Sequence, residues 1–215
     1  MASRIMHLAI ADGIVKETNI QNINRFKLGN ILPDAYSLGI NTAVSHLKTK
    51  ILGGTKITYK LEYFRDTYNG EILHDDLYLG YYIHLIQDIL FRQFLYDEYK
   101  WNPMPEGNVE KLHNDYGLLN TYIIEKYGVS NELHIPDEIK EERIFDIYPF
   151  DLKQLEKGFQ NDFQPYREGK EFFFTKNMVD EYIEKTIPIC VMEINALRQG
   201  KYVIDEVIYA WNAHK

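Results

Sequence analysis

Hydrophobic residues recur along most of this chain at the spacing of an amphipathic helix. Near the N-terminus, Ile5, Leu8, Ala9, Ala11 and Val15 fall on one face of a helix with about 3.6 residues per turn. No segment shows a convincing series of alternating apolar and polar residues, which is the pattern of half-buried strands. We therefore expect a chain that is helical almost throughout.

The longest apolar segment is HDDLYLGYYIHLIQDILFRQFLYDEY, residues 74–99. Either Asp75 or Asp76 suits its N-terminal cap, because a carboxylate accepts hydrogen bonds from the first backbone N–H groups and favours the helix dipole. Pro103 and Pro105 of NPMPEG follow and would stop the helix. The pattern predicts a long, buried central helix.

Further helices are expected on both sides of this segment. They cover residues 21–29, 58–68, 108–128, 136–144, 150–160, 177–200 and 203–215. Gly29 and Gly128 are interpreted as C-terminal stops and Asn108 as an N-terminal cap. Residues 44–54, which end in Gly53-Gly54, are interpreted as irregular. The sequence thus predicts a single all-α domain over residues 1–215, with about eight helices.

Composition and charge narrow the function classes. A chain of 215 residues can bury a sizeable core, and its net charge of −8 argues against a general nucleic-acid binder. One cysteine, Cys190, excludes both an internal disulfide and a cysteine-based zinc site, and its apolar neighbours predict that it is buried. Neither a signal peptide nor an apolar run of about 18 residues is present. We expect a soluble, cytoplasmic protein.

Two polar residues interrupt the apolar pattern of the long helix. His84 and Asp88 are four residues apart, so they share a helix face that is expected to point inward. A buried carboxylate without a partner is costly, and a metal ion is one partner that would offset the cost. In the alternative interpretation, Asp88 simply orients the His84 ring, as in many buried histidine–carboxylate pairs.

The order of motifs adds a family resemblance. An N-terminal helix with His7 is followed by LGNILPDA, then SHL, then LGYYIHLIQD. This series resembles the zinc-dependent phospholipase C family, an all-helical family similar in fold to zinc-dependent single-strand nucleases. The resemblance covers roughly the first 115 residues, and the last hundred carry no motif that matches.

The resemblance implies a set of metal ligands. Asp34, His46, His84 and Asp88 would surround one zinc ion, and Asp88 would bridge to a second that also takes His7. His113 would be the one histidine available to a further ion, with Asp115 or Glu110 nearby. One to three zinc ions are implied, with two expected. The same donors also suit Mn, Fe or Ni.

The resemblance also implies a reaction. Metal-assisted hydrolysis of a small phosphoester would use Asp34 as a general base, and Arg92, one turn beyond Asp88, to contact the phosphate. Secreted members of the family use the N-terminal amine and a tryptophan at the mature start as ligands. Here Met1-Ala2-Ser3 stands at that place, and the first tryptophan is Trp101. No nucleic-acid partner is expected, and neither the substrate nor the oligomeric state follows from the sequence.

Two other interpretations remain open. An HD-type phosphohydrolase would also be helical and would use His46, the adjacent pair His74-Asp75 and the distant Asp115. This interpretation leaves the ILPDA motif and the His84/Asp88 pair without a role. A helical binding scaffold without catalytic activity is the second alternative, and it need not bind any metal.

Overall fold

The computed structural model describes residues 2–36, 42–164 and 169–213, and within them the chain is predominantly helical. The α-helices are α1 (Arg4–Glu17), α2 (Ile23–Ile31), α3 (Leu61–Thr67), α4 (Asn69–His74), α5 (Asp76–Gln93), α6 (Asn108–Tyr127), α7 (Leu152–Asp162) and α8 (Lys176–Leu197). The predicted all-α class is thereby confirmed.

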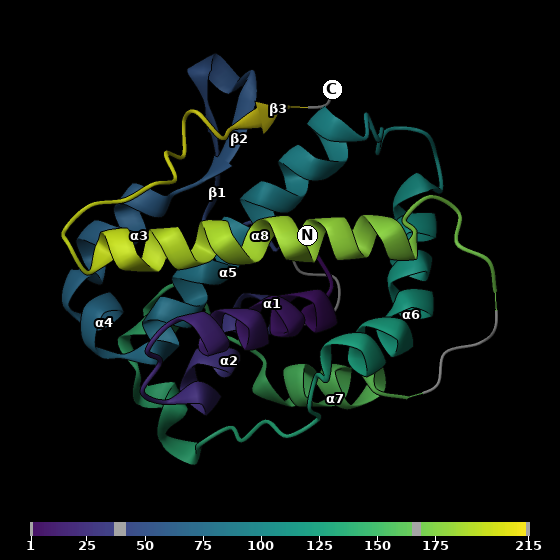
Figure 1. Cartoon of the computed structure of the whole chain (residues 1–215). Helices are drawn as coiled ribbons and strands as arrows, with labels where there is room; N and C mark the ends of the chain where they lie inside the picture. The colour runs from purple at the N-terminus through teal and green to yellow at the C-terminus, as the bar shows by residue number, and fades with distance from the viewer. Residues whose placement is uncertain (1, 37–41, 165–168, 214–215) are drawn as a thin grey trace.

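Two helices, α1 and α5, form the centre of the molecule. Every residue from Leu77 to Phe91 in α5 is buried, and so are most residues of α1, because other helices cover them on several sides. In Figure 1, α8 crosses α5 and runs beside α1, while α7 lies on the other side of α1 and α6 near its right-hand end. The N-terminal cap of α5 is Asp75, one of the two residues predicted for this role. Its side chain accepts a hydrogen bond from the backbone N–H of Leu77.

Glycines bring α2 and α5 into unusually close contact. A Cβ atom added at Gly29 would lie 2.1 Å from the carbonyl oxygen of Leu77, and one at Gly80 would lie 2.2 Å from that of Phe26. The prediction that Gly29 stops its helix was therefore wrong: Gly29 lies inside α2, where it permits the close approach of two backbones.

A small antiparallel sheet is the main departure from the predicted elements. Its strands are β1 (Lys48–Ile51), β2 (Lys56–Tyr59) and β3 (Trp211–Asn212), in the order β1-β2-β3. Residues 44–54 were expected to be irregular, 58–68 to be helix throughout and 203–215 to be helix. Of these predictions, only the part of 58–68 that forms α3 is correct. The flanking residues form strands instead, because β2 pairs with β1 on one side and with β3 on the other. Gly53 and Gly54, with positive φ, form the turn of the hairpin.

Other helix ends differ from expectation by small amounts. Asn108 is the first residue of α6 and not its cap, which is Gly107, whereas Gly128 ends α6 in the left-handed conformation as predicted. The helix predicted over residues 136–144 is instead a pair of 3-10 turns, Asp137–Glu141 and Arg143–Asp146.

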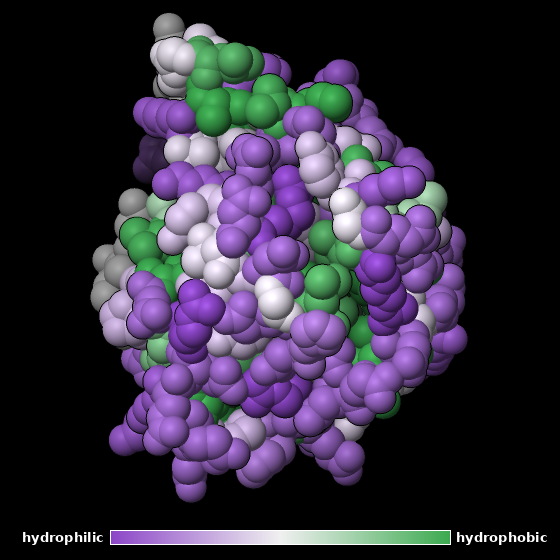
Figure 2. Space-filling view, turned by 90° about the vertical axis from the view of Figure 1, so that its left-hand side faces the viewer, coloured by the Kyte–Doolittle hydropathy of each residue, from purple (hydrophilic) through white to green (hydrophobic). Residues whose placement is uncertain are grey.

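The surface and the helices give two further findings. No helix in the part of the chain that the structure describes is both long and apolar enough to cross a membrane. In Figure 2 the surface is mostly hydrophilic, with a hydrophobic patch at the top, over the β1–β2 hairpin. Leu52, Val207 and Ile208 are among the exposed hydrophobic residues of the sheet and the segment before β3. Cys190 is buried, as expected.

Asp115 anchors a long connection to α6. Its carboxylate accepts hydrogen bonds from the backbone N–H groups of Phe172, Phe173 and Phe174, at 2.7, 2.8 and 2.9 Å. The side chain is fully buried, and the three donors supply hydrogen-bond partners to a carboxylate that is removed from water. Asp115 thus holds the chain just before α8 against α6.

We predict that Asp115→Asn lowers the free energy of unfolding by roughly 2–3 kcal/mol, because the amide has one acceptor oxygen where the carboxylate has two. Urea denaturation measures the effect, and Glu110→Gln, an exposed change on the same helix, should stay within about 0.5 kcal/mol of wild type. A stability unchanged by Asp115→Asn would contradict the anchoring role.

Candidate metal centre

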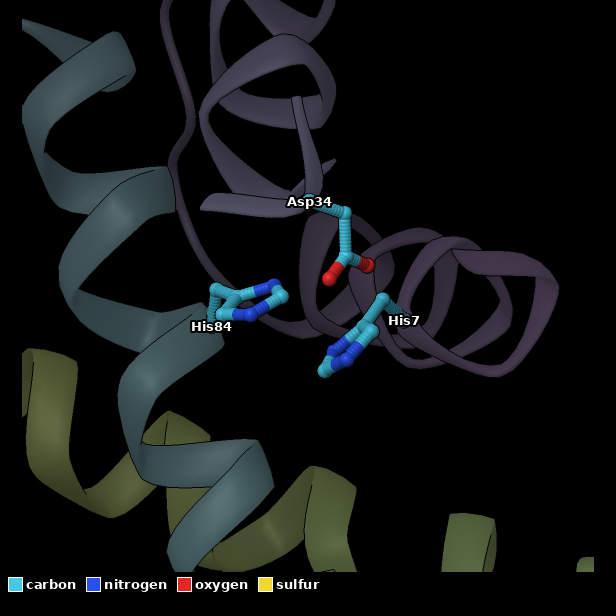
Figure 3. Close-up of side chains that lie close together, drawn as sticks. All are labelled: His7, Asp34 and His84. Carbon is cyan, nitrogen blue, oxygen red and sulfur yellow. The ribbon is translucent and has the colours of Figure 1, made fainter. Parts of the chain in front are cut away.

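Three side chains from three separate segments meet in the interior. His7 comes from α1, Asp34 from the 3-10 turn Leu32–Asp34 that directly follows α2, and His84 from α5. They point toward one another in Figure 3. The rings of His7 and His84 are stacked, with their centroids 4.0 Å apart. One ligand atom from each of the three lies within 4.8 Å of the others, which is a distance that a single metal ion can bridge.

His46 and Asp88 extend this group into a cluster of five, which we call the His/Asp cluster. The Nε2 atom of His46 lies 3.1 Å from that of His84 and 3.5 Å from an oxygen of Asp34. Asp88 is central: its carboxylate oxygens lie 3.6, 3.7 and 3.8 Å from the Nε2 atoms of His7, His46 and His84. A second group that could share an ion is His46, His84 and Asp88.

The other nitrogen of each ring is fixed from outside the cluster. The Nδ1 atom of His84 is 2.7 Å from the carbonyl oxygen of Asn30, and that of His46 is 3.0 Å from the carbonyl oxygen of Thr42. Because a carbonyl oxygen only accepts, both Nδ1 atoms carry the proton. Each Nε2 atom then presents a lone pair to the cluster.

His7 is oriented through a short chain of amides. Its Nδ1 atom lies 2.6 Å from Oε1 of Gln87, whose Nε2 donates to Oδ1 of Asn30 at 2.8 Å. Asn30 in turn donates from Nδ2 to the carbonyl of Phe26. This direction of donation assigns the His7 proton to Nδ1, and its Nε2 is a buried atom without a hydrogen-bond partner. The network therefore directs the lone pairs of the three imidazoles into the cluster, where His84 belongs to both groups of potential ligands.

The charge states suit ligands. Burial lowers the pKa of His84 to about 3, so the ring is neutral near pH 7. Burial works against ionisation of Asp34, yet its interactions with the neighbouring His46, His84 and His7 bring its pKa down to about 2. The pKa of Asp88 is likewise held well below the usual range against the effect of burial, first by the charge of the N-terminal amine and then by His7 and His84. Neutral imidazoles and ionised carboxylates are the forms that bind divalent metals.

Without a cation, this arrangement would be unfavourable. Two carboxylates are removed from water, and the bare Nε2 atoms of His46 and His84 face each other at 3.1 Å. Partial compensation comes from the backbone N–H of Ala2 and the hydroxyl of Tyr59, which donate to Asp88 at 2.9 and 3.3 Å. A divalent ion among the Nε2 atoms and carboxylates would satisfy the remaining lone pairs.

The cluster reaches two cavities. Asp34, 8% exposed, lines one of about 340 Å³ together with Arg4 and Tyr36. His46 lines the other, of about 220 Å³, together with Lys48 and Arg92. His113 and Tyr116 belong to the walls of both. Asp34 and His46 therefore each line a cavity, whereas Asp88 is fully buried.

Six metal ligands were predicted, and five of them lie in the cluster. The sixth, His113, is in neither of the two groups and is exposed on α6, so the structure does not join it to the other five. Asp115, one of its two proposed companions, is engaged by the backbone of residues 172–174. Arg92, the predicted substrate contact, lines the smaller cavity beside His46.

The residues of the HD-type interpretation do not come together. His74 is exposed at the end of α4, and Asp75 caps α5 and forms an ion pair with Arg25. Asp115 holds backbone N–H groups, so only His46 of this set faces the His/Asp cluster.

Sequence reasoning missed several residues around the cluster. Tyr59 was assigned to a helix, but at the end of β2 its hydroxyl reaches Asp88. Lys48 lay in a segment interpreted as irregular. Asn30 and Gln87 were passed over, although both stand inside the two quoted motifs, LGNILPDA and LGYYIHLIQD. The amide residue inside each apolar motif was the signal that could have identified them, because a buried amide needs a polar partner.

Comparisons with protein-family models, with curated proteins and with solved structures find no match to this chain.

Proposed function

We propose that this protein is a metal-dependent hydrolase that activates water to cleave a small phosphoester. The observation that carries the proposal is the His/Asp cluster, in which three imidazoles are held with their Nε2 lone pairs directed inward against two ionised carboxylates. Such an arrangement costs free energy without a cation and is well suited to one.

Zinc is the expected metal, because nitrogen from histidine and oxygen from carboxylate are its common ligands. The two groups of potential ligands share His84, and each includes one of the carboxylates, Asp34 or Asp88. This overlap supports two ions as readily as one, since both sets lie in one compact cluster. Manganese, iron or nickel would find the same donors acceptable.

A bound divalent ion would lower the pKa of a water molecule and polarise the phosphoryl oxygen. Asp34 is the cluster carboxylate that also reaches a cavity, so it is placed to accept a proton from a water molecule there. In the proposed reaction the water oxygen bonds to phosphorus as the bond to the leaving oxygen breaks, and that oxygen takes up a proton. Asp88, fully buried, would hold metal and take no part in proton transfer.

We propose a small-molecule substrate and no nucleic-acid partner. The two cavities at the cluster, about 340 and 220 Å³, suit small molecules, and a chain with net charge −8 lacks the basic footprint of a general nucleic-acid binder.

Metal content of protein purified without a histidine tag tests the proposal. Plasma mass spectrometry should find one to two equivalents of zinc or a related metal in wild type and none in Asp34→Ala, with at least about a 100-fold loss of phosphoesterase activity in that variant. His74→Ala, at an exposed histidine, is the control and should keep both.

The outcomes separate the three interpretations. Loss of metal from His74→Ala with retention in Asp34→Ala would support the HD-type set. Wild-type protein that holds no metal and cannot be reconstituted with zinc or manganese would support a binding scaffold and overturn the hydrolase.

A further inference from the structure

Two cations stand beside the His/Asp cluster, where Asp88 acts on both through its charge but not through a direct ion pair. Lys48 of β1 and Arg92 of α5 line the cavity of about 220 Å³ that His46 also lines. Within the described ranges, neither side chain forms an ion pair with a carboxylate. This is notable in a chain with 32 acidic and 24 basic residues, where carboxylates are in excess.

Arg92 is held by aromatic groups instead. Its guanidinium lies over the rings of Tyr96 and Trp211, at 5.5 and 5.7 Å from their centroids, and its Nη1 donates to the hydroxyl of Tyr96. Its Nε is buried without a hydrogen-bond partner. Aromatic faces favour a cation without using its N–H donors, and the donors that Tyr96 does not engage match the oxygens of a phosphate.

The cavity is connected to the cluster. Tyr59, which lies in its wall, donates its hydroxyl to Asp88, and His46 belongs to both the wall and the cluster. An anion held by Lys48 and Arg92 would therefore be adjacent to the proposed metal ligands. The remaining wall is largely aromatic and aliphatic, with Trp101, Tyr116 and Leu112 among its residues.

We propose that this cavity binds the phosphate of a soluble phosphate monoester whose organic part is apolar or aromatic. The inference rests on the proposed function and narrows its substrate class. A monoester carries a charge of about −1.5 to −2 near pH 7, enough to pair with both cations, whereas a diester carries one charge and would leave a cation unpaired. The aromatic wall would contact the organic part and exclude water from it.

Isothermal titration of protein as purified with inorganic phosphate tests the anion site. Saturable binding is expected in wild type, about tenfold or more weaker in Lys48→Met and in Arg92→Met, because each removes a charged donor. Lys50→Met, at an exposed residue two positions along β1 that does not line the cavity, is the matched control and should bind like wild type.

Lys48→Met is the more informative variant, because the Lys48 side chain is exposed on a strand and its replacement should not disturb folding. Arg92 packs among aromatic rings, so Arg92→Met could lose binding through misfolding alone. Phosphate binding that is unchanged in Lys48→Met, with the variant folded by circular dichroism, would overturn the inference. So would equal weakening by Lys50→Met, which would indicate a general surface charge effect.

A ligand series tests the substrate class. Phenyl phosphate should bind more tightly than glycerol phosphate, and both more tightly than diphenyl phosphate. A preference for the diester would overturn the charge argument. If the protein sediments with phosphatidic acid vesicles but does not bind soluble phenyl phosphate, the ligand is a lipid headgroup and the proposal of a soluble monoester is rejected.

Metal content measured on the same samples separates this inference from the proposed function. Phosphate binding that depends on Lys48, in protein that holds no metal and cannot be reconstituted with zinc or manganese, would keep the anion site and reject the hydrolase. If the protein holds metal but its phosphate affinity is unchanged by Lys48→Met and Arg92→Met, the hydrolase proposal stands and the anion site is rejected.

Discussion

Asp88→Ala is expected to abolish metal binding and, with it, any effect of a chelator on stability. Asp88 is fully buried and lies within 3.8 Å of the Nε2 atoms of all three histidines of the cluster, His7, His46 and His84. A ligand that binds only the folded state stabilises it by about 4 kcal/mol at 1,000 times its dissociation constant. For a protein of this size, that amounts to roughly 8–16 °C in Tm.

Thermal unfolding with and without a chelator measures this effect. Wild type should lose roughly 8–16 °C in Tm when its metal is removed, and should regain it with zinc. Asp88→Ala should show a chelator shift below about 2 °C, whatever its own Tm.

Asp88→Asn is the companion variant, since it preserves shape and an acceptor for the backbone N–H of Ala2 while removing the charge. It should also be insensitive to the chelator, because a neutral amide is a poor ligand for zinc. An Asp88→Asn protein that responds to the chelator as wild type does would contradict the central role of this carboxylate.

Gly29→Ala and Gly80→Ala are each expected to lower the free energy of unfolding by about 3 kcal/mol or more, at the upper end of what overpacking costs. The added Cβ would lie 2.1 Å from a backbone oxygen of α5 in the first case and 2.2 Å from one of α2 in the second. Backbone atoms cannot rotate away as the end of a side chain can, so the two helices must separate.

Separation of α2 from α5 would also disturb the cluster. The Nδ1–H group of His84 donates a hydrogen bond to the carbonyl oxygen of Asn30, the residue after Gly29. We therefore expect both glycine variants to bind metal more weakly than wild type, although neither glycine belongs to the cluster.

Urea denaturation followed by circular dichroism measures the stability of these variants. Gly70→Ala is the matched control, because Gly70 lies in α4, where an added Cβ atom would meet no heavy atom within 4 Å, and alanine is the better helix former. It should be neutral or stabilising by up to about 1 kcal/mol. A Gly29→Ala protein within about 0.5 kcal/mol of wild type would show that α2 and α5 do not pack this closely.

The sequence by itself determined the helical class and the central pair of the cluster. Apolar residues at helical spacing predicted a buried α5, Asp75 was one of two predicted caps, and the four-residue interval placed His84 and Asp88 on one face. These features are local, since they depend on the pitch of a helix and on hydrogen bonds within its first turn.

The tertiary structure alone decided what surrounds that pair. His7, Asp34 and His46 were named through a family resemblance, but their distances to Asp88 or to one another depend on how α1, α2 and the segment before β1 pack on α5. His113 carries the same imidazole, yet the position of α6 leaves it outside both groups of potential ligands. Residue type was therefore not sufficient to select the cluster.

The small sheet is the clearest case of a feature that the sequence did not reveal. Ile57 and Trp211 are 154 positions apart and pair as neighbours on β2 and β3. The short strands contain too few residues to show an alternating pattern, and their stability comes from pairing across the chain and not from local preference. Tyr59 and Lys48 reach the cluster and its smaller cavity through this sheet, although Tyr59 was expected in a helix and Lys48 in an irregular segment.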